Sequence, residues 1–221
     1  YNPAYSGEVR IPLKTLALAA AGVIAIEGLA RWGIGRWGLA PLTGTALARL
    51  IDIAWMALVV SGCPQGWARI GLGRGSRLPG MGRGLIWSAG FGALAALGWV
   101  VLQAAGIDPL RLLHQGPVSR PASPAPIFLV GGFIGPVAEE IFFRGLIFGY
   151  FRRWGFRPAL ALSTLVFALL HAGASAVPIP QIVGGLVFAT AYEIEKKSLV
   201  PITIHVLGNM ALFSLPYLSR I

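Results

Sequence analysis

Charged residues are scarce in this sequence of 221 residues. They make up 12% of it, whereas about a quarter of the residues in an average soluble domain are charged. Hydrophobic residues account for 56% of the chain, and the mean hydropathy is +0.72. A single globular core cannot enclose so much apolar sequence, but a lipid bilayer can. The composition therefore predicts an integral membrane protein.

Several reactive motifs are also missing. Cys63 is the single cysteine, so no disulfide can form within the chain. The sequence contains no Gly-x-Ser-x-Gly, the motif around the nucleophilic serine of many hydrolases, and no His-Glu-x-x-His, the zinc-binding helix motif of many metalloproteases. These absences argue against both classes of enzyme. Asp52 and Asp108 do not form a paired aspartate motif of the intramembrane aspartyl type. These absences leave water, activated by other side chains, as the nucleophile for a hydrolase.

Acidic residues are few, with 8 against 18 lysines and arginines, and the net charge is +10. Because the basic residues lie mainly between apolar runs, we interpret them as loop charges that set membrane orientation and meet anionic headgroups. No nucleic-acid recognition module is visible, so we expect no nucleic-acid partner. The expected partners are membrane lipid and a protein or peptide substrate.

Seven apolar segments are long enough, or nearly so, to cross a bilayer. They are residues 11–30, 41–62, 84–106, 125–149, 158–176, 179–192 and 199–217. The sixth is short, and 158–192 could instead surround a broken helix, because Pro178 and Pro180 interrupt it. The predicted fold class is all-α, a polytopic transmembrane bundle of about seven spans, with six to eight as the range.

With the N-terminus placed in the cytoplasm, the inner segments hold eleven basic residues and the outer segments hold five. This distribution follows the positive-inside rule and predicts a multi-pass protein of the inner or plasma membrane with a cytoplasmic N-terminus. No internal repeat indicates a transporter built from two related halves. We therefore expect one membrane domain, 1–221, in which 125–215 carry the motifs and 1–124 have no assigned role.

Ionisable groups inside apolar spans are costly, so each needs an explanation. Glu27 lies near the end of the first predicted span, and we interpret it as an interfacial anchor. Arg49 and Asp52 are three residues apart on the second span, so they share a helix face, and we expect a structural ion pair.

The fourth span holds the most unusual group, Glu139-Glu140-x-x-x-Arg144, with apolar sequence on both sides. In a helix, Glu140 and Arg144 are four apart in the favourable order for an ion pair, whereas Glu139 points about 100° away. The two carboxylates therefore have different surroundings. We expect Glu140 and Arg144 to form a supporting pair and Glu139 to be free to act as a base.

Two of the three histidines lie in later spans. His171 follows Phe167 by one turn in the fifth span, and His205 precedes Asn209 by one turn in the seventh. Polar residues inside a bundle face inward toward one another, so we expect these side chains to converge on the glutamates. His114 falls in the predicted outer loop, where we expect it to be solvated.

These groups allow two kinds of hydrolysis. Glu139 and His171 could take a proton from a water molecule held between them, while His205 and Asn209 donate hydrogen bonds to the oxyanion. Alternatively, His171, His205 and Glu139 could form a His₂Glu ligand set for zinc, with water in the fourth position. Residue types alone do not separate the two possibilities.

Three motifs in this order, on successive apolar segments, resemble the CPBP family of intramembrane proteases. That family includes type II CAAX prenyl endopeptidases and the bacterial CAAX protease self-immunity proteins. The motifs are Glu139-Glu140-x-x-x-Arg144, Phe167-x-x-x-His171 and His205-x-x-x-Asn209. The resemblance covers about residues 125–215.

The resemblance implies that Glu139 is the catalytic glutamate, His171 its partner on the water, and His205 with Asn209 the oxyanion site. Glu140, Arg144 and Phe167 would support them. It further implies a metal-free glutamate protease, with zinc as the alternative cofactor. The short, basic chain, rich in Gly, Ala and Arg, indicates a bacterial protein. For such a member, the resemblance implies a membrane-anchored or C-terminal sorting-signal peptide as the substrate. Two other functions stay open, a proton- or ion-coupled transporter and a non-catalytic immunity or scaffold protein.

Overall fold

The computed structural model describes residues 10–73, 77–109, 124–172 and 177–218. Helices and short connections make up this part of the chain, and none of the described residues forms a strand, so the all-α prediction is confirmed. The helices are α1 (Leu13–Trp37), α2 (Pro41–Ser61), α3 (Gly66–Arg69), α4 (Arg77–Ala104), α6 (Ala125–Leu129), η2 (Val130–Ile134), α7 (Gly135–Glu140), η3 (Ile141–Phe148), α8 (Gly149–Phe151), η4 (Arg152–Trp154), α9 (Phe156–His171), α10 (Ile179–Glu195) and α11 (Leu199–Leu218).

Each of the seven predicted segments overlaps a helix, and residues 173–176 of the fifth segment lie outside the described residues. Five helical stretches are long and apolar enough to cross a bilayer, namely Leu13–Trp37, Pro41–Ser61, Leu78–Ala104, Ala125–Trp154 and Leu199–Tyr217. These apolar helices make this an integral membrane protein. The other two segments, α9 and α10, have 16 and 17 residues and pack against each other.

The first helix is longer than the sequence predicts. It continues past Arg31 to Trp37 and ends at Gly38, whose φ of 65° is the left-handed conformation that commonly terminates helices. Glu27 therefore lies inside α1, ten residues before its end. The helix packs along α2, where the indole of Trp55 lies over Gly22 and donates to the carbonyl of Leu18 at 3.1 Å.

The central helical stretch, from α6 to η4, is continuous but not uniformly α-helical. Its turns widen to π-helix in η2 and η3, on either side of α7. In η2 the amide of Gly135 donates to the carbonyl of Val130, five residues back. Pro136 follows directly, and it has no amide hydrogen and a ring that crowds the preceding turn. The wider turn accommodates this proline just before the two glutamates.

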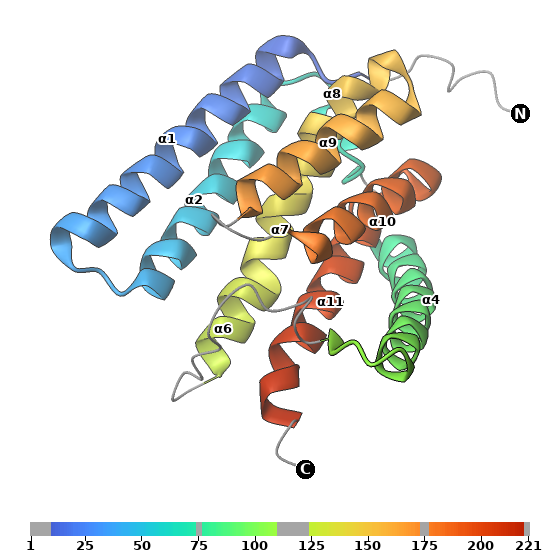
Figure 1. Cartoon of the computed structure of the whole chain (residues 1–221). Coiled ribbons are helices and arrows are strands. Elements are labelled where there is room, and N and C mark those ends of the chain that lie inside the picture. Colours follow the sequence, from blue (N-terminus) through green and yellow to red (C-terminus); the bar gives the residue numbers. More distant parts are fainter. Residues whose placement is uncertain (1–9, 74–76, 110–123, 173–176, 219–221) are drawn as a thin grey trace, which may run out of the picture.

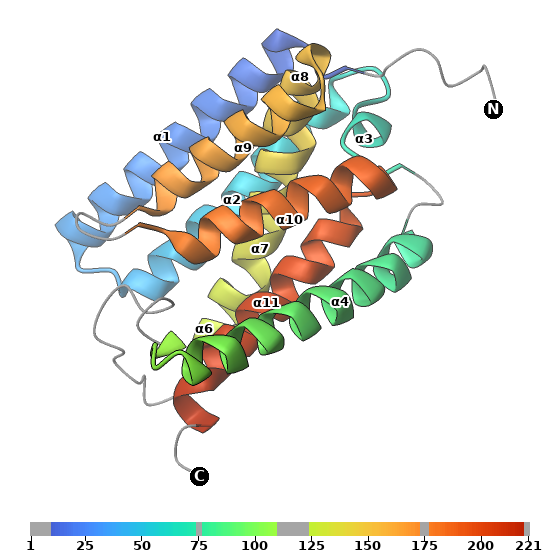
Figure 2. The same ribbon diagram turned by 45° about the vertical axis from the view of Figure 1, so that its right-hand side comes forward.

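The other helices surround this central stretch (Figures 1 and 2). The α1–α2 pair lies on one side of it, the α9–α10 hairpin packs across η3, and α11 runs beside η2 and α7. α4 lies at the periphery against α11. The main buried core forms where these elements meet, around Phe142, Phe143, Leu146 and Phe167. The central stretch thus has neighbours from both the N-terminal and the C-terminal parts of the chain.

Glycine permits close packing at the helix crossings near the glutamates. A Cβ atom at Gly185 of α10 would lie 2.7 Å from the Cγ2 atom of Thr164 on α9. A Cβ atom at Gly132 would lie 2.9 Å from Met210 of α11. Small residues let transmembrane backbones approach in this way, which brings the polar side chains of separate helices within reach of one another.

Candidate active site

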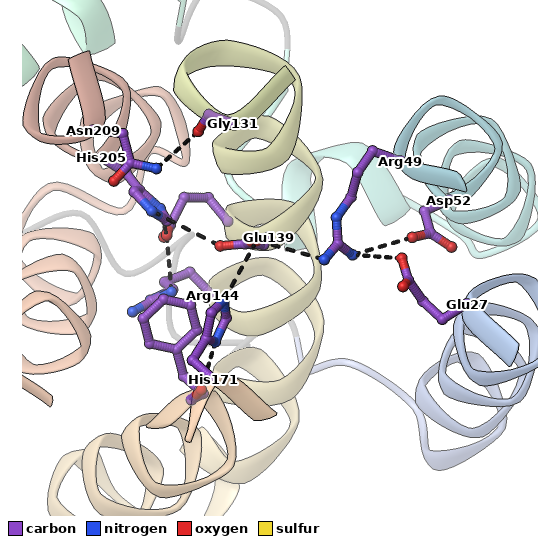
Figure 3. A network of polar contacts seen from close by, with 11 residues as sticks. Glu27, Arg49, Asp52, Gly131, Glu139, Arg144, His171, His205 and Asn209 are labelled. Carbon is purple, nitrogen blue, oxygen red and sulfur yellow. Dashed lines mark hydrogen bonds and ion pairs between the residues drawn. The ribbon is translucent and has the colours of Figure 1, made fainter. Parts of the chain in front are cut away.

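Glu139 and Glu140 are the last two residues of α7, close to the middle of the 30-residue stretch Ala125–Trp154. At about 1.5 Å of rise per residue, they lie roughly 20 Å from either end. Two carboxylates at this depth are costly in lipid and need partners within the protein. The neighbours of Glu139 are shown in Figure 3 and differ in part from those of Glu140.

Glu140 is fully buried and has two charged or polar neighbours. Its Oε1 atom accepts from Nη1 of Arg144 at 2.8 Å and lies 2.8 Å from Nδ1 of His205 on α11. The Glu140–Arg144 pair predicted from the spacing is therefore present. Its further contact with His205 joins the first and third motifs through one carboxylate oxygen.

Arg144 is buried among aromatic side chains. Its guanidinium carbon lies 4.7 Å from the ring centre of Phe167 and 5.1 Å from that of Phe188, close enough for cation–π attraction. Its Nη2 atom donates to the carbonyl of Gly185 at 3.5 Å. Arg144 thus links α9 and α10 to the central stretch through its contacts with Phe167, Phe188 and Gly185.

Glu139 faces both histidines. Its Oε1 atom lies 3.6 Å from Nε2 of His171, and its Oε2 atom lies 3.8 Å from Nε2 of His205. The side chain of Glu139 is 12% exposed and that of His171 is 28% exposed, so the cluster is not sealed. These distances exceed a direct hydrogen bond, and they leave the carboxylate and the two imidazoles as neighbours rather than locked partners.

Hydrogen bonds at the Nδ1 atoms set the tautomers of the two rings. Nδ1 of His171 lies 2.8 Å from the carbonyl oxygen of Phe167, which can only accept, so this nitrogen carries a hydrogen. Nδ1 of His205 faces Glu140, a carboxylate already paired with Arg144, and donates in the same way. In the neutral rings, both Nε2 atoms therefore present lone pairs to the space around Glu139.

Asn209 lies one turn after His205 on α11 and points to the same side (Figure 3). One hydrogen of its amide group is donated to the carbonyl of Gly131 in η2, at 2.9 Å. The NH₂ group has two hydrogens, so the second remains available to a ligand. The bond to Gly131 fixes the direction of the amide.

Arg49 of α2 also belongs to this cluster, a contact that our predictions did not include. Its Nη2 atom lies 3.7 Å from Oε1 of Glu139, and its Nη1 atom lies 3.4 Å from Oδ2 of Asp52 and 2.9 Å from Oε1 of Glu27. The predicted Arg49–Asp52 pair is present. Glu27, which we interpreted as an interfacial anchor, has its carboxylate turned to Arg49, and α1 continues ten residues beyond it.

A signal for this network existed in the sequence. Glu27, Arg49 and Asp52 are ionisable residues in apolar spans, and such residues turn toward one another inside a bundle. Among the residues of the predicted site, those in described helices are Glu139, Glu140, Arg144, Phe167, His171, His205 and Asn209. His114 and most of the predicted outer loop lie outside the described residues.

The His₂Glu set has the donor types of a zinc site, and the Nδ1 bonds of both rings match the outer-shell bonds of metal-binding histidines. Two features of the surroundings of these three side chains favour a site without zinc. Nη2 of Arg49 lies 3.7 Å from Oε1 of Glu139, where it competes with a cation for this carboxylate, and no group of three such side chains in the described ranges is placed to hold an ion.

Comparison with known proteins shows a similarity that covers most of the cluster. The family model described as type II CAAX prenyl endopeptidase Rce1-like matches residues 121–211. The membrane-embedded CAAX protease MroQ of Staphylococcus aureus (strain USA300) is 39% identical over 90 residues, which cover 38% of this chain and 36% of MroQ. The putative membrane peptidase YdiL of Bacillus subtilis (strain 168) is 32% identical over 84 residues, 38% of this chain and 34% of YdiL.

The chain matches about a third of the length of each of these bacterial relatives. No solved structure matches it. The matched segment begins before the central stretch and ends two residues after Asn209, so it contains all three motifs, while α1, α2 and α4 precede it. Residues 121–211 of the chain are therefore similar to the Rce1-like CAAX protease family.

Proposed function

We propose that this protein is an intramembrane endopeptidase that hydrolyses a peptide bond with water activated by Glu139 and His171. The observation that carries the proposal is the placement of the Glu139 carboxylate between the Nε2 atoms of His171 and His205, at 3.6 and 3.8 Å. Peptide hydrolysis requires groups that accept and donate protons. Here a carboxylate midway along an apolar helical stretch and two imidazoles from neighbouring helices can serve as these groups.

In the proposed reaction, a water molecule donates its hydrogens to Glu139 and to the Nε2 lone pair of His171. Its oxygen attacks the peptide carbonyl carbon, forming a C–O bond as the proton passes to Glu139. The same proton then moves to the departing amide nitrogen as the C–N bond breaks. Glu139 is thus base and then acid, and the products are a carboxylic acid and an amine.

The oxyanion of the tetrahedral intermediate requires hydrogen-bond donors. Asn209 supplies the amide hydrogen that Gly131 does not use, and it needs no protonation to do so. His205 donates from Nε2 only in its cationic form, because the hydrogen on Nδ1 is committed to Glu140. Glu140, itself paired with Arg144, holds the His205 ring in place.

The proposed substrate is a bacterial peptide segment in or beside the membrane, such as a C-terminal sorting signal. Two facts support this class. The relatives are bacterial membrane peptidases by name, and the cluster lies about 20 Å from either end of its helix, at a depth that a membrane-embedded segment reaches.

The proposed chemistry uses no metal, and zinc bound by His171, His205 and Glu139 is the alternative. The contact between Arg49 and Glu139 supports the metal-free form, because a guanidinium beside the carboxylate competes with a divalent cation for it. Chelation and metal analysis of the active protein test this choice.

The test compares bacterial membranes that carry the wild-type chain with membranes that carry Glu139→Gln. Chemical labelling of new peptide N-termini, read by mass spectrometry, identifies cleavage sites. We expect sites in or next to apolar segments only with the wild type. A Glu193→Gln variant is the matched control, because Glu193 pairs with Arg152 and Lys196 rather than with the cluster. Identical sets of termini with wild type and Glu139→Gln would refute the proposal.

A further inference from the structure

Arg49 comes from α2, outside the segment that matches the protease family. We propose that Arg49 is a positioning residue that orients the Glu139 carboxylate, and that Glu27 and Asp52 hold Arg49 for this purpose. The proposal rests on the proposed function, and it gives the α1–α2 pair a role in the catalytic centre.

The contacts of Glu139 are divided between its two oxygens. Oε1 faces Nε2 of His171 at 3.6 Å and Nη2 of Arg49 at 3.7 Å, while Oε2 faces Nε2 of His205 at 3.8 Å. A carboxylate can rotate about its terminal bond with little cost. Arg49 attracts Oε1 toward the His171 side, which leaves Oε2 directed at His205. The arginine thus selects the rotation in which each oxygen meets one histidine.

Arg49 is itself held from two helices. Its Nη1 atom lies 2.9 Å from Oε1 of Glu27 on α1 and 3.4 Å from Oδ2 of Asp52, one turn further along α2 (Figure 3). The side chain of Asp52 is 1% exposed, and that of Arg49 is 23% exposed. An arginine side chain has many rotamers, and two carboxylates on one nitrogen restrict it to those that point Nη2 at Glu139.

The charges around Arg49 argue against a role in binding an anionic substrate. Three carboxylates, those of Glu27, Asp52 and Glu139, surround this one guanidinium. A fourth carboxylate, such as the C-terminus of a peptide, would be repelled by these three and would gain little from the single positive charge of Arg49. The arrangement therefore favours positioning of Glu139, and it predicts an effect on turnover rather than on substrate binding.

The test measures kcat and KM of the full chain in proteoliposomes. The probe is a single-span peptide with a short polar motif before an apolar helix and a basic tail, and with a fluorophore and a quencher on either side of that motif. We expect Arg49→Gln to lower kcat about 10- to 100-fold, as misplacement of a catalytic group does, with KM changed less than about threefold. Arg36→Gln is the matched control, because Arg36 is exposed in the last turn of α1.

Two more variants keep the test decisive if Arg49→Gln folds poorly. Arg49→Lys keeps the charge but loses the planar fork, and we expect it to restore part of the lost kcat. Glu27→Gln removes one anchor, and we expect a smaller loss of kcat of the same kind, with an unchanged thermal midpoint.

The outcomes separate this proposal from the proposed function. Wild-type kcat in Arg49→Gln, or a change in KM alone, would overturn the positioning role while Glu139→Gln remains inactive. Full activity of Glu139→Gln, or a wild-type chain that leaves the probe intact, would overturn the proposed function itself.

Discussion

Replacement of Arg144 by methionine tests how the first motif holds the bundle together. Arg144 and Glu140 are 1% and 0% exposed, and their charged atoms lie 2.8 Å apart. Two unit charges about 4 Å apart interact by roughly 4 kcal/mol at an effective dielectric constant of about 20. Loss of the cation also leaves Glu140 buried with His205 as its remaining polar neighbour among the described contacts.

Removal of one partner from a buried ion pair typically costs about 3–5 kcal/mol. We therefore expect Arg144→Met to destabilise the protein by about this amount. For a domain of this size, each 1 kcal/mol corresponds to about 2–4 °C in thermal midpoint, so the expected decrease is about 6–20 °C. The assay is thermal unfolding in detergent, followed by circular dichroism, with Arg83→Met as the control because Arg83 is 54% exposed.

A second variant separates the ion pair from simple packing. The double variant Glu140→Gln with Arg144→Met removes both charges, and we expect it to be more stable than Arg144→Met alone, because no unpaired buried charge remains. A decrease of less than about 2 °C for Arg144→Met would refute the reasoning. So would a double variant that is as unstable as the single one, since packing around Arg144 would then explain the whole effect.

Three further predictions follow from single contacts. Asn209→Ala removes an oxyanion donor, and we expect kcat to fall about 10²–10³-fold, whereas rates unchanged within twofold would exclude the residue from that site. Gly185→Ala places a Cβ atom 2.7 Å from Cγ2 of Thr164, and we expect a loss of about 1–3 kcal/mol in the same unfolding assay. Gly208→Ala is its control, because nothing lies within 4 Å of that Cβ position, and equal effects of the two would contradict the packing argument. Chelator-treated protein, checked by metal analysis, should retain full cleavage of the single-span peptide, and activity that returns only with added zinc would establish the alternative.

Local spacing accounts for the parts of this site that the sequence predicts. Glu140 and Arg144, His171 and Phe167, and His205 and Asn209 each lie four apart, so helical geometry alone places the two members of each pair on one face. The seven apolar segments likewise follow from hydropathy and length. These features depend on one helix at a time, which is why they could be predicted.

Features that depend on how helices rotate against one another could not be predicted. The contact of Glu27 with Arg49 requires both the full length of α1 and its rotation on α2, and the predicted end of the first span at residue 30 concealed it. The contact of Arg49 with Glu139 joins residues 90 positions apart. The π-helical turns around α7 were missed because hydrophobic periodicity is read with the α-helical repeat.

The most direct test of the catalytic role of Glu139 is the cleavage rate of the single-span fluorogenic peptide by wild type and Glu139→Gln in proteoliposomes. Glutamine has the same shape but cannot take a proton from water. We expect the rate to fall about 10²–10⁴-fold, the usual contribution of a general base, while Glu193→Gln cleaves at the wild-type rate. Cleavage by Glu139→Gln at the wild-type rate would contradict the account.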